Sequence, residues 1–311
     1  MSTLRLFKNI VKNLVAVGAL LKSDNFKFLT FAIPGDFYSP IPDLSEIQNE
    51  AGEIFDRSPK FLPAIAINEE TQIGLVAEFS RFQKEISFPE KKTPDYRYYL
   101  DNAYFSYGDG VLLYSFLRHF RPKRVIEVGS GFSSALMLDV NERYFDGDIQ
   151  FTFIEPYPDR LFSLLSDRDK QLHRVETMVV QHVDSNVFTS LNEGDILFID
   201  SSHVAKTHSD VLHILFNVLP NLKDGVIVHF HDILWPFEYP DSWLMAGRAW
   251  NEAYILRAFL QYNPTFEILF FNSYMELYQR EILLKNMPLT LKTPSSAVTP
   301  GNTSLWIRKI R

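Results

Sequence analysis

The chain contains no cysteine, which excludes disulfides, thiolate metal ligands and a cysteine nucleophile. Basic residues do not outnumber acidic ones: the chain has 31 Lys and Arg and 38 Asp and Glu, giving a formal net charge of −7. No basic stripe interrupts that balance, so we expect small-molecule partners and no nucleic acid. No run approaches the ~20 apolar residues that span a bilayer, and we expect a soluble, cytoplasmic protein. Its 311 residues suffice for a large core plus a smaller appended part.

The first 22 residues predict an amphipathic helix with basic residues beside its apolar face. Such a helix can lie on a membrane surface or dock on its own protein, and we favour docking because helices with one apolar stripe are ordinary parts of globular proteins. A signal peptide is disfavoured, since the apolar centre is short and no small-x-small cleavage site follows. The apolar face consists of Phe7, Ile10, Val11, Leu14, Val17 and Leu21.

Prolines punctuate residues 28–94, where they break long helices into short segments and turns. We therefore expect an N-terminal extension over residues 1–100 and a catalytic domain over residues 101–311. Apolar spacing from Val111 to Phe120 predicts the first helix of that domain, with Asp109 as a signal for its start.

The catalytic domain alternates apolar strand-like runs with helical patterns. This alternation is typical of an α/β protein in which helices cover both faces of a mostly parallel sheet. Two later runs, at 266–271 and 304–309, are expected to pair and close the sheet. The other predicted strands are 124–128, 150–155, 177–183, 195–200 and 226–232, and the predicted helices are 133–144, 158–168 and 204–219.

Each predicted parallel strand ends in a polar or ionisable residue. Ligands of open α/β sheets bind outside the carboxyl ends of the strands, so these residues are expected to share one crevice. They are Glu127 and Gly129 on the first strand, Glu155 on the second, Asp184 past the third, Asp200 on the fourth, and His231 and Asp232 on the fifth.

The turn after the first strand, Gly129-Ser130-Gly131, is typical of a nucleotide-binding unit, because glycines let the backbone turn sharply and approach a ligand. The dinucleotide-binding fold is characterised by the motif G-x-G-x-x-G, but here Ser134 occupies the position of the third glycine. S-adenosylmethionine is the alternative ligand. Glu155 suits the ribose diol of either, so spacing alone leaves both classes open.

Longer motifs resemble the class I S-adenosylmethionine-dependent methyltransferases, in the branch with an EVGSG first motif and an FIDSSH fourth strand. The similar stretches span most of the chain: VIEVGSGFSS, FIEPYP, DILFIDSSHVAKTHSDV and GVIVHFHDILWPFEYP, with FYSPIPD upstream and GRAWNEAYILRAFL downstream. The resemblance implies a Rossmann-like seven-stranded sheet whose last strand is antiparallel. One departure is Ser133, which replaces the third glycine of the E-x-G-x-G-x-G form.

The same resemblance implies roles for individual residues around the cofactor. It implies that Glu155 binds the ribose and that Asp184 lies near the adenine. The methionine end of the cofactor would be lined by Glu127, Gly129, Ser130 and Gly131.

Methyl transfer to a hydroxyl requires an acceptor held in line with the activated methyl group and a base that removes a proton. His203, His229 and His231 are candidate bases, because a neutral imidazole is available near pH 7. One of the two strand histidines, His229 or His231, is equally well explained as a structural residue. Asp200 completes the predicted catalytic set of His203, His231 and Asp200.

A divalent metal is a further hypothesis. Some O-methyltransferases hold magnesium with one acid after the fourth strand and two ligands after the fifth, and Asp200, His231 and Asp232 stand in similar positions here. His231 departs from an all-oxygen set and would equally suit zinc, iron or manganese. Transfer without a metal remains our default interpretation.

An aromatic segment from Trp235 to Tyr262 is predicted to form one wall of the acceptor pocket, with Asp241 and Trp243 as the preferred pocket residues. The leading hypothesis is a methyltransferase acting on oxygen of a sugar or secondary metabolite. The alternatives are an NAD-dependent oxidoreductase and a non-catalytic protein that binds a partner through its N-terminal extension.

Overall fold

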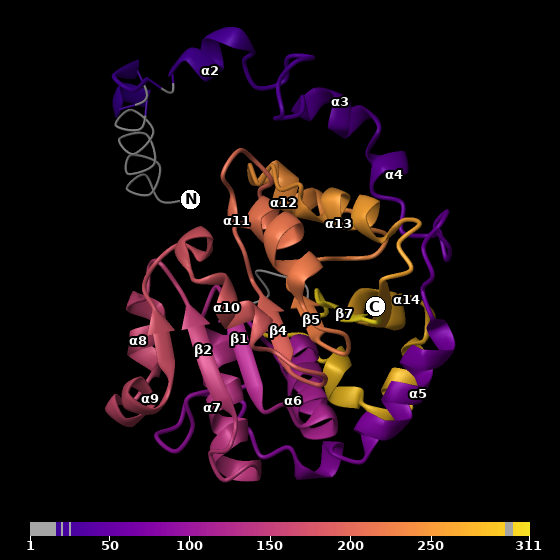
Figure 1. Ribbon diagram of the computed structural model, residues 1–311. Helices are drawn as coiled ribbons and strands as arrows, with labels where there is room; N and C mark the ends of the chain where they lie inside the picture. Colours follow the sequence, from indigo (N-terminus) through magenta and orange to yellow (C-terminus); the bar gives the residue numbers. More distant parts are fainter. Residues whose placement is uncertain (1–16, 20, 25, 296–300) are drawn as a thin grey trace. The chain divides into compact units, whose positions relative to one another are not determined.

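The computed structural model describes residues 17–19, 21–24, 26–295 and 301–311 (Figure 1). Most of the predicted helix at 1–22 lies outside these residues. The chain divides into two compact units. One comprises the described residues up to Asp56 together with Pro240–Ala249, and the other comprises Arg57–Tyr239 and Trp250–Arg311.

The larger unit contains a seven-stranded sheet in the order β3-β2-β1-β4-β5-β7-β6. Strands β1 to β5 are parallel to one another, whereas β7 runs antiparallel to both β5 and β6. This confirms the predicted Rossmann-like fold class and the pairing of the last two runs. The strands are β1 (Arg124–Val128), β2 (Gln150–Ile154), β3 (Arg174–Glu176), β4 (Ile196–Ile199), β5 (Ile227–Phe230), β6 (Phe266–Phe271) and β7 (Leu305–Lys309).

The predicted third strand at 177–183 is wrong. The strand occupies Arg174–Glu176, and the apolar run after it contains a 3₁₀ turn at Val180–His182. Val180 and Val183 are buried there, so the run was apolar because it packs against the core and not because it extends along the sheet.

Helices precede and connect the strands. The predicted helix before the first strand is confirmed as α6 (Tyr107–Phe120), with Asp109 in its first turn. The predicted helix at 204–219 begins later, because Ser209 caps the backbone N–H of Leu212 and starts α11 there. The others in the larger unit are α5 (Glu69–Ser80), α7 (Phe132–Tyr144), α8 (Asp159–Leu164), α9 (Asp167–Leu172), α10 (Ser185–Thr189), α11 (Asp210–His213), α13 (Glu252–Leu260), α14 (Asn272–Tyr278) and α15 (Arg280–Asn286).

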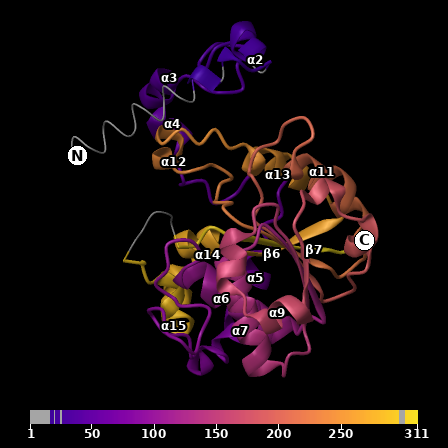
Figure 2. The same ribbon diagram turned by 90° about the vertical axis from the view of Figure 1, so that its left-hand side faces the viewer.

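Segments far apart in the sequence pack together in this unit. Helix α5 contacts α6 and α15, and Figure 2 shows these three helices together, below the edge strand β6 in that view. The indole of Trp235 donates to the carbonyl of Pro59 at 2.7 Å, and the Tyr98 N–H donates to Asp139 at 2.9 Å. The predicted extension of residues 1–100 therefore does not coincide with the smaller unit, since residues 57–100 pack with the sheet.

The core beneath the middle of the sheet is aromatic. Trp306 of β7 stacks on Phe116 of α6 with ring centroids 3.7 Å apart, and Phe198 of β4 stacks on His229 of β5 at 3.8 Å. Stacked rings of this size bury large apolar areas, so this layer fixes β4, β5 and β7 side by side.

The smaller unit is built from short helices. These are α2 (Phe26–Phe31), α3 (Leu44–Asn49), α4 (Ala51–Ile54) and α12 (Asp241–Met245). Asp43 caps α3, because its carboxylate accepts from the backbone N–H groups of Ser45 and Glu46. Among the described residues of the whole chain, no helix has the length and apolar character needed to cross a membrane.

Candidate active site

The carboxyl ends of β1, β2, β4 and β5 bring most of the predicted site residues together. The backbone N–H of Asp200 donates to the Val128 carbonyl at 2.8 Å, and that of His231 donates to the Ile199 carbonyl at 2.9 Å. These bonds place the residues that follow each strand at one edge of the sheet. The predicted site residues that follow these four strands therefore lie together at this edge, the candidate crevice.

The turn after β1 requires glycine at Gly129. Its φ is +80°, a region that L side chains rarely adopt, and an added Cβ would lie 1.8 Å from the carbonyl oxygen of Asp200. Gly131 is different: its φ of −178° is extended backbone, and an added Cβ would meet only Arg160 Cδ, at 3.4 Å. Gly129 thus brings the ends of β1 and β4 into backbone contact, whereas Gly131 has a backbone conformation that other residues can adopt.

Glu127 explains why serines follow the glycine turn. The Ser133 hydroxyl donates to one Glu127 carboxylate oxygen at 2.5 Å, and the Ser134 hydroxyl donates to the other. Glu127 is fully buried, and this burial raises the pKa of its carboxyl to about 8, against the opposing effect of the serine hydrogen bonds. Ser133, where the third glycine of the motif was expected, therefore serves as a hydrogen-bond donor.

Glu155, just past β2, is held by the backbone. Its carboxylate accepts from the Ser130 N–H at 3.0 Å and from the Tyr157 N–H at 2.8 Å. The carboxylate is therefore fixed beside the glycine turn, where it has further lone pairs available. Its expected role in binding a ribose diol stays a prediction.

His203 lies at the centre of the other side of the crevice. Its Nδ1 is 2.8 Å from Glu252 Oε2, while Nε2 is 3.4 Å from Asp200 Oδ1 and 3.7 Å from Asp232 Oδ2. Burial opposes protonation of His203, but hydrogen bonds with Asp200 and Glu252 and the charge of Asp232 outweigh it and raise the pKa well above its ordinary value.

The backbone around His203 is strained. His203 has a φ of +59° and Asp232 a φ of +56°, and both are non-glycine residues. Such conformations cost ~1–3 kcal/mol each and persist only where surrounding contacts enforce them. Here the His203 carbonyl accepts from the N–H groups of Asn251 and Glu252 at the start of α13. The strain therefore serves to aim the imidazole into the crevice.

Asp200 and His231 complete this side. Burial alone would raise the pKa of Asp200, but the charge of His231 and the contact with His203 lower it, so this carboxylate is ionised near neutrality. His231 Nε2 lies 3.6 Å from Asp232 Oδ1. Burial disfavours the charged form of His231, but Asp232, Asp200 and Asp109 raise its pKa above the ordinary value.

His229 has a structural role. Neither ring nitrogen makes a hydrogen bond of good geometry within the described part of the chain, and the ring lies between Phe198 and Trp306. Burial, together with the charge of His231, lowers the pKa of His229 well below its ordinary value, so the ring is neutral. Of the two strand histidines, His231 is the one that reaches the crevice.

One predicted residue of the larger unit, Asp184, is not brought to this edge. Asp184 caps α10 and lines a pocket with Arg124 and Gln150, the first residues of β1 and β2, because the chain turns back after the short β3. Asp241 and Trp243 belong to α12 in the smaller unit, so their predicted pocket role stays a prediction.

The predicted metal ligands do not assemble a metal site. Within the described ranges, no three or more histidine and acidic side chains converge as a set that could hold a metal ion. The His203 ring reaches toward both Asp200 and Asp232, and His231 offers only one nitrogen to this group, at 3.6 Å from Asp232. Asp200, His231 and Asp232 therefore do not fit the predicted role.

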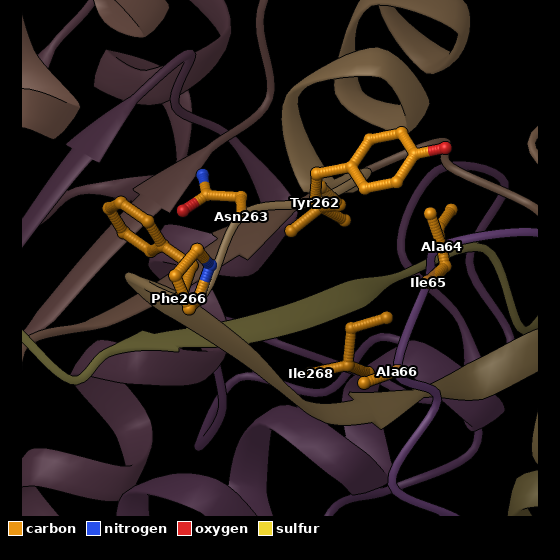
Figure 3. A pocket seen from close by; sticks show the side chains of 9 residues that line it. Ala64, Ile65, Ala66, Tyr262, Asn263, Phe266 and Ile268 are labelled. Carbon is orange, nitrogen blue, oxygen red and sulfur yellow. The ribbon is translucent and has the colours of Figure 1, made fainter.

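A separate apolar hollow lies at the far edge of the sheet, against the edge strand β6 (Figure 3). Ala64, Ile65 and Ala66 line one side, and Phe266 and Ile268 of β6 line another. It contains no acid, base or cation, so it offers no group for proton transfer.

Comparison with known proteins matches the part of the chain that carries the candidate crevice. A family model described as a methyltransferase domain matches residues 126–233. An uncharacterised protein of Archaeoglobus fulgidus is 34% identical over 170 residues, which cover 52% of this chain and 75% of that relative. Residues 126–233, the stretch from β1 to just past β5, are thus similar to a methyltransferase domain. Of the two ligands left open by the glycine turn, this match favours S-adenosylmethionine over NAD.

Solved structures of low sequence identity also resemble the chain. The O-methyltransferase TomG of Streptomyces achromogenes, in complex with S-adenosylmethionine, is 13% identical, with 72% of this chain and 86% of that chain covered and a TM-score of 0.36. The apo structure of CmcI is 16% identical, with coverage of 71% and 72% and a TM-score of 0.39.

Two residues of the site were missed by the sequence reasoning. Glu252 lies in the aromatic segment and was not predicted as a site residue, yet it holds His203 from 49 positions away. Asp109 was noted only as a helix start, yet it is a buried acceptor behind His231. The one available signal was an acidic residue at the start of a helix, which usually indicates no more than favourable placement at the helix N-terminus.

Proposed function

We propose that this methyltransferase acts on a hydroxyl of a small molecule, with His203 as the base that takes the hydroxyl proton. The observation that carries the proposal is the His203 geometry: one ring nitrogen is held by a buried glutamate, and the other faces the crevice between Asp200 and Asp232.

The residues on the β1 and β2 side fit the cofactor. The start of α7 at Gly131 and the fixed carboxylate of Glu155 would hold it, with Glu127 behind them. S-adenosylmethionine, when bound, supplies a methyl group that is already activated for transfer. The remaining task for the protein is to place the acceptor and remove its proton.

Glu252 determines which nitrogen of His203 is available. A carboxylate 2.8 Å from Nδ1 holds the proton there, so the neutral ring presents the lone pair of Nε2 to the crevice. Glu252 is itself fixed, because the Ser201 hydroxyl donates to its carboxylate at 3.0 Å. This is the arrangement of an oriented general base.

The acceptor class follows from the walls around His203. Trp250 lies against the imidazole with ring centroids 4.3 Å apart, and Tyr239 lies 5.8 Å from Trp250. An aromatic face beside carboxylates suits a neutral polyhydroxylated ring, such as a sugar or a hydroxylated secondary metabolite. The carboxylates disfavour an anionic acceptor.

The test is turnover of the His203→Gln variant on a panel of monosaccharides and phenols, measured as release of S-adenosylhomocysteine. We expect kcat to fall ~10²–10⁴-fold, the usual contribution of a general base, while S-adenosylhomocysteine binding measured by calorimetry stays unchanged. The kcat of Glu252→Gln should fall less, because the imidazole of His203 remains in place.

The pH dependence supplies a second arm of the test. The base must be neutral, and its pKa is raised, so kcat/KM should increase with pH through a pKa above 6.5. Unchanged turnover by His203→Gln on an acceptor that the wild type methylates would remove His203 from the reaction.

A further inference from the structure

We propose that Asp109, acting through Ser304, is a positioning residue that fixes the orientation and the tautomer of His231 for the methyl-transfer site. The proposal rests on the proposed function, in which His231 lines the crevice beside Asp232. It assigns a role to a buried acid that lies behind the site and does not face it.

Asp109 is surrounded by neutral donors. Its side chain is buried in the first turn of α6, and it accepts from Asn272 Nδ2 at 2.8 Å, from the Thr303 N–H at 3.1 Å and from the Ser304 hydroxyl at 2.6 Å. The Thr303 hydroxyl adds a fourth hydrogen bond at 3.2 Å. A carboxylate is well suited to accept so many hydrogen bonds at once.

The carboxylate determines the direction of the next hydrogen bond. A serine hydroxyl has one proton, and Ser304 gives it to Asp109. The Ser304 oxygen can therefore act only as an acceptor toward His231 Nδ1, which lies 3.5 Å away. In neutral His231 the bond to Ser304 favours the proton on Nδ1, whereas Asp232 beside Nε2 favours a proton there, so Ser304 determines the balance between the two tautomers.

This arrangement parallels that of His203. In both cases a buried acid favours the proton on Nδ1, directly for His203 through Glu252 and through Ser304 for His231. Both rings consequently present Nε2 to Asp232, at 3.7 Å and 3.6 Å. The Phe105 ring, 5.2 Å from His231, packs against the imidazole and restricts its rotation.

The experiment removes the connecting hydroxyl. Ser304→Ala leaves Asp109 and His231 in place, so we expect the ¹⁵N chemical shifts of the His231 ring to show the balance moved from the Nδ1–H toward the Nε2–H tautomer. On an acceptor from the panel that the wild type methylates, kcat of the variant should fall ~10-fold with KM nearly unchanged. Asp109→Asn should go further, because an amide NH₂ can donate to Ser304 and let its hydroxyl donate to His231, which favours the Nε2–H tautomer.

Thr303→Val is the matched control. It removes another hydrogen bond to the same carboxylate but has no contact with His231, so tautomer and kcat should stay as in the wild type. Thermal unfolding and binding of S-adenosylhomocysteine verify that each variant is folded.

Three results would overturn the proposal: an unchanged His231 tautomer in Ser304→Ala, a changed tautomer with unchanged kcat, or an equal effect of Thr303→Val. The ¹⁵N measurement needs no acceptor. A failure of the proposed function, seen as no turnover by the wild type, is therefore distinguishable from a failure of this inference.

Discussion

The carboxylates on the two sides of the crevice have different kinds of hydrogen-bond and charge partners. At the ends of β1 and β2, Glu127 and Glu155 are met by serine hydroxyls and backbone N–H groups, which do not change charge near neutrality. At the ends of β4 and β5, Asp200 and Asp232 are met by imidazoles, which do. The hydrogen-bond donors on the β1 and β2 side therefore keep their charge near neutrality, whereas those on the β4 and β5 side can gain or lose a proton.

The largest expected effect breaks the contact between the two sides. Gly129→Ala would place a Cβ 1.8 Å from the Asp200 carbonyl in a backbone conformation with φ +80°, so the turn must move. We expect the midpoint of thermal unfolding to fall by about 10 °C or more and S-adenosylhomocysteine binding to be lost, as measured by thermal scans and calorimetry.

Gly131→Ala is the matched control for that change. Its φ is extended and its new Cβ meets only the flexible Arg160 side chain, so unfolding should change little. Equal destabilisation by the two alanines would contradict the backbone contact assigned to Gly129.

Glu127→Gln sharpens the comparison on the cofactor side through pH. The folded pKa of about 8 lies above the ordinary 4.5, so the stabilisation from protonating Glu127 is present below pH 4.5 and is lost as pH rises through 8. The neutral glutamine has no such loss. The free energy of unfolding of the wild type should therefore fall relative to the variant between these pH values, by up to about 5 kcal/mol.

Urea unfolding at several pH values checks this sign. The Ser133→Ala variant should show a still steeper loss with pH, because the serine hydrogen bond opposes the raised pKa. A difference between wild type and Glu127→Gln that does not vary with pH would show that Glu127 is ionised in the folded protein.

Glu155→Ala tests the cofactor side, and thermal unfolding shows whether loss of the hydrogen bonds from Ser130 and Tyr157 destabilises the turn. Loss of a carboxylate that bonds a ribose diol should weaken S-adenosylhomocysteine binding ~10–100-fold, the value of one or two charge-assisted hydrogen bonds. Asp159→Ala, an exposed acid at the start of the adjacent helix α8, is the control and should bind normally. Equal affinity of both variants would leave the ribose without its assigned partner.

The sequence predicted the elements that local pattern determines. The strand at 124–128 and the one at 266–271 agree with β1 and β6, because apolar period and flanking turns define them. The third strand was misplaced, since an apolar run reads the same in a strand and in a buried turn. Local pattern therefore located the sheet but not every strand within it.

The site was predictable where it follows a strand and not where it depends on distant contacts. Asp200, His203 and Asp232 stand at or near strand ends, so topology alone gathers them. Glu252 contacts His203 from 49 positions away, and Asp109 is linked to His231, 122 positions away, through Ser304. A single sequence gives no indication of such long-range pairs. Asp184 failed for the opposite reason, because its position depended on the misplaced strand.

The smallest expected effect separates the two histidines of β5. His229 is neutral and held by stacking, so His229→Phe keeps the ring contacts with Phe198 and Trp306 and removes only buried nitrogens. Its free energy of unfolding should change by less than about 1.5 kcal/mol, as for other volume-conserving core substitutions, and kcat should be unchanged. His231→Phe, two residues along the same face of the strand, should retain stability to a similar degree but lose turnover. Comparable kcat losses in the two variants would mean that His229 also takes part in the reaction, and that the boundary between core and site lies deeper in β5.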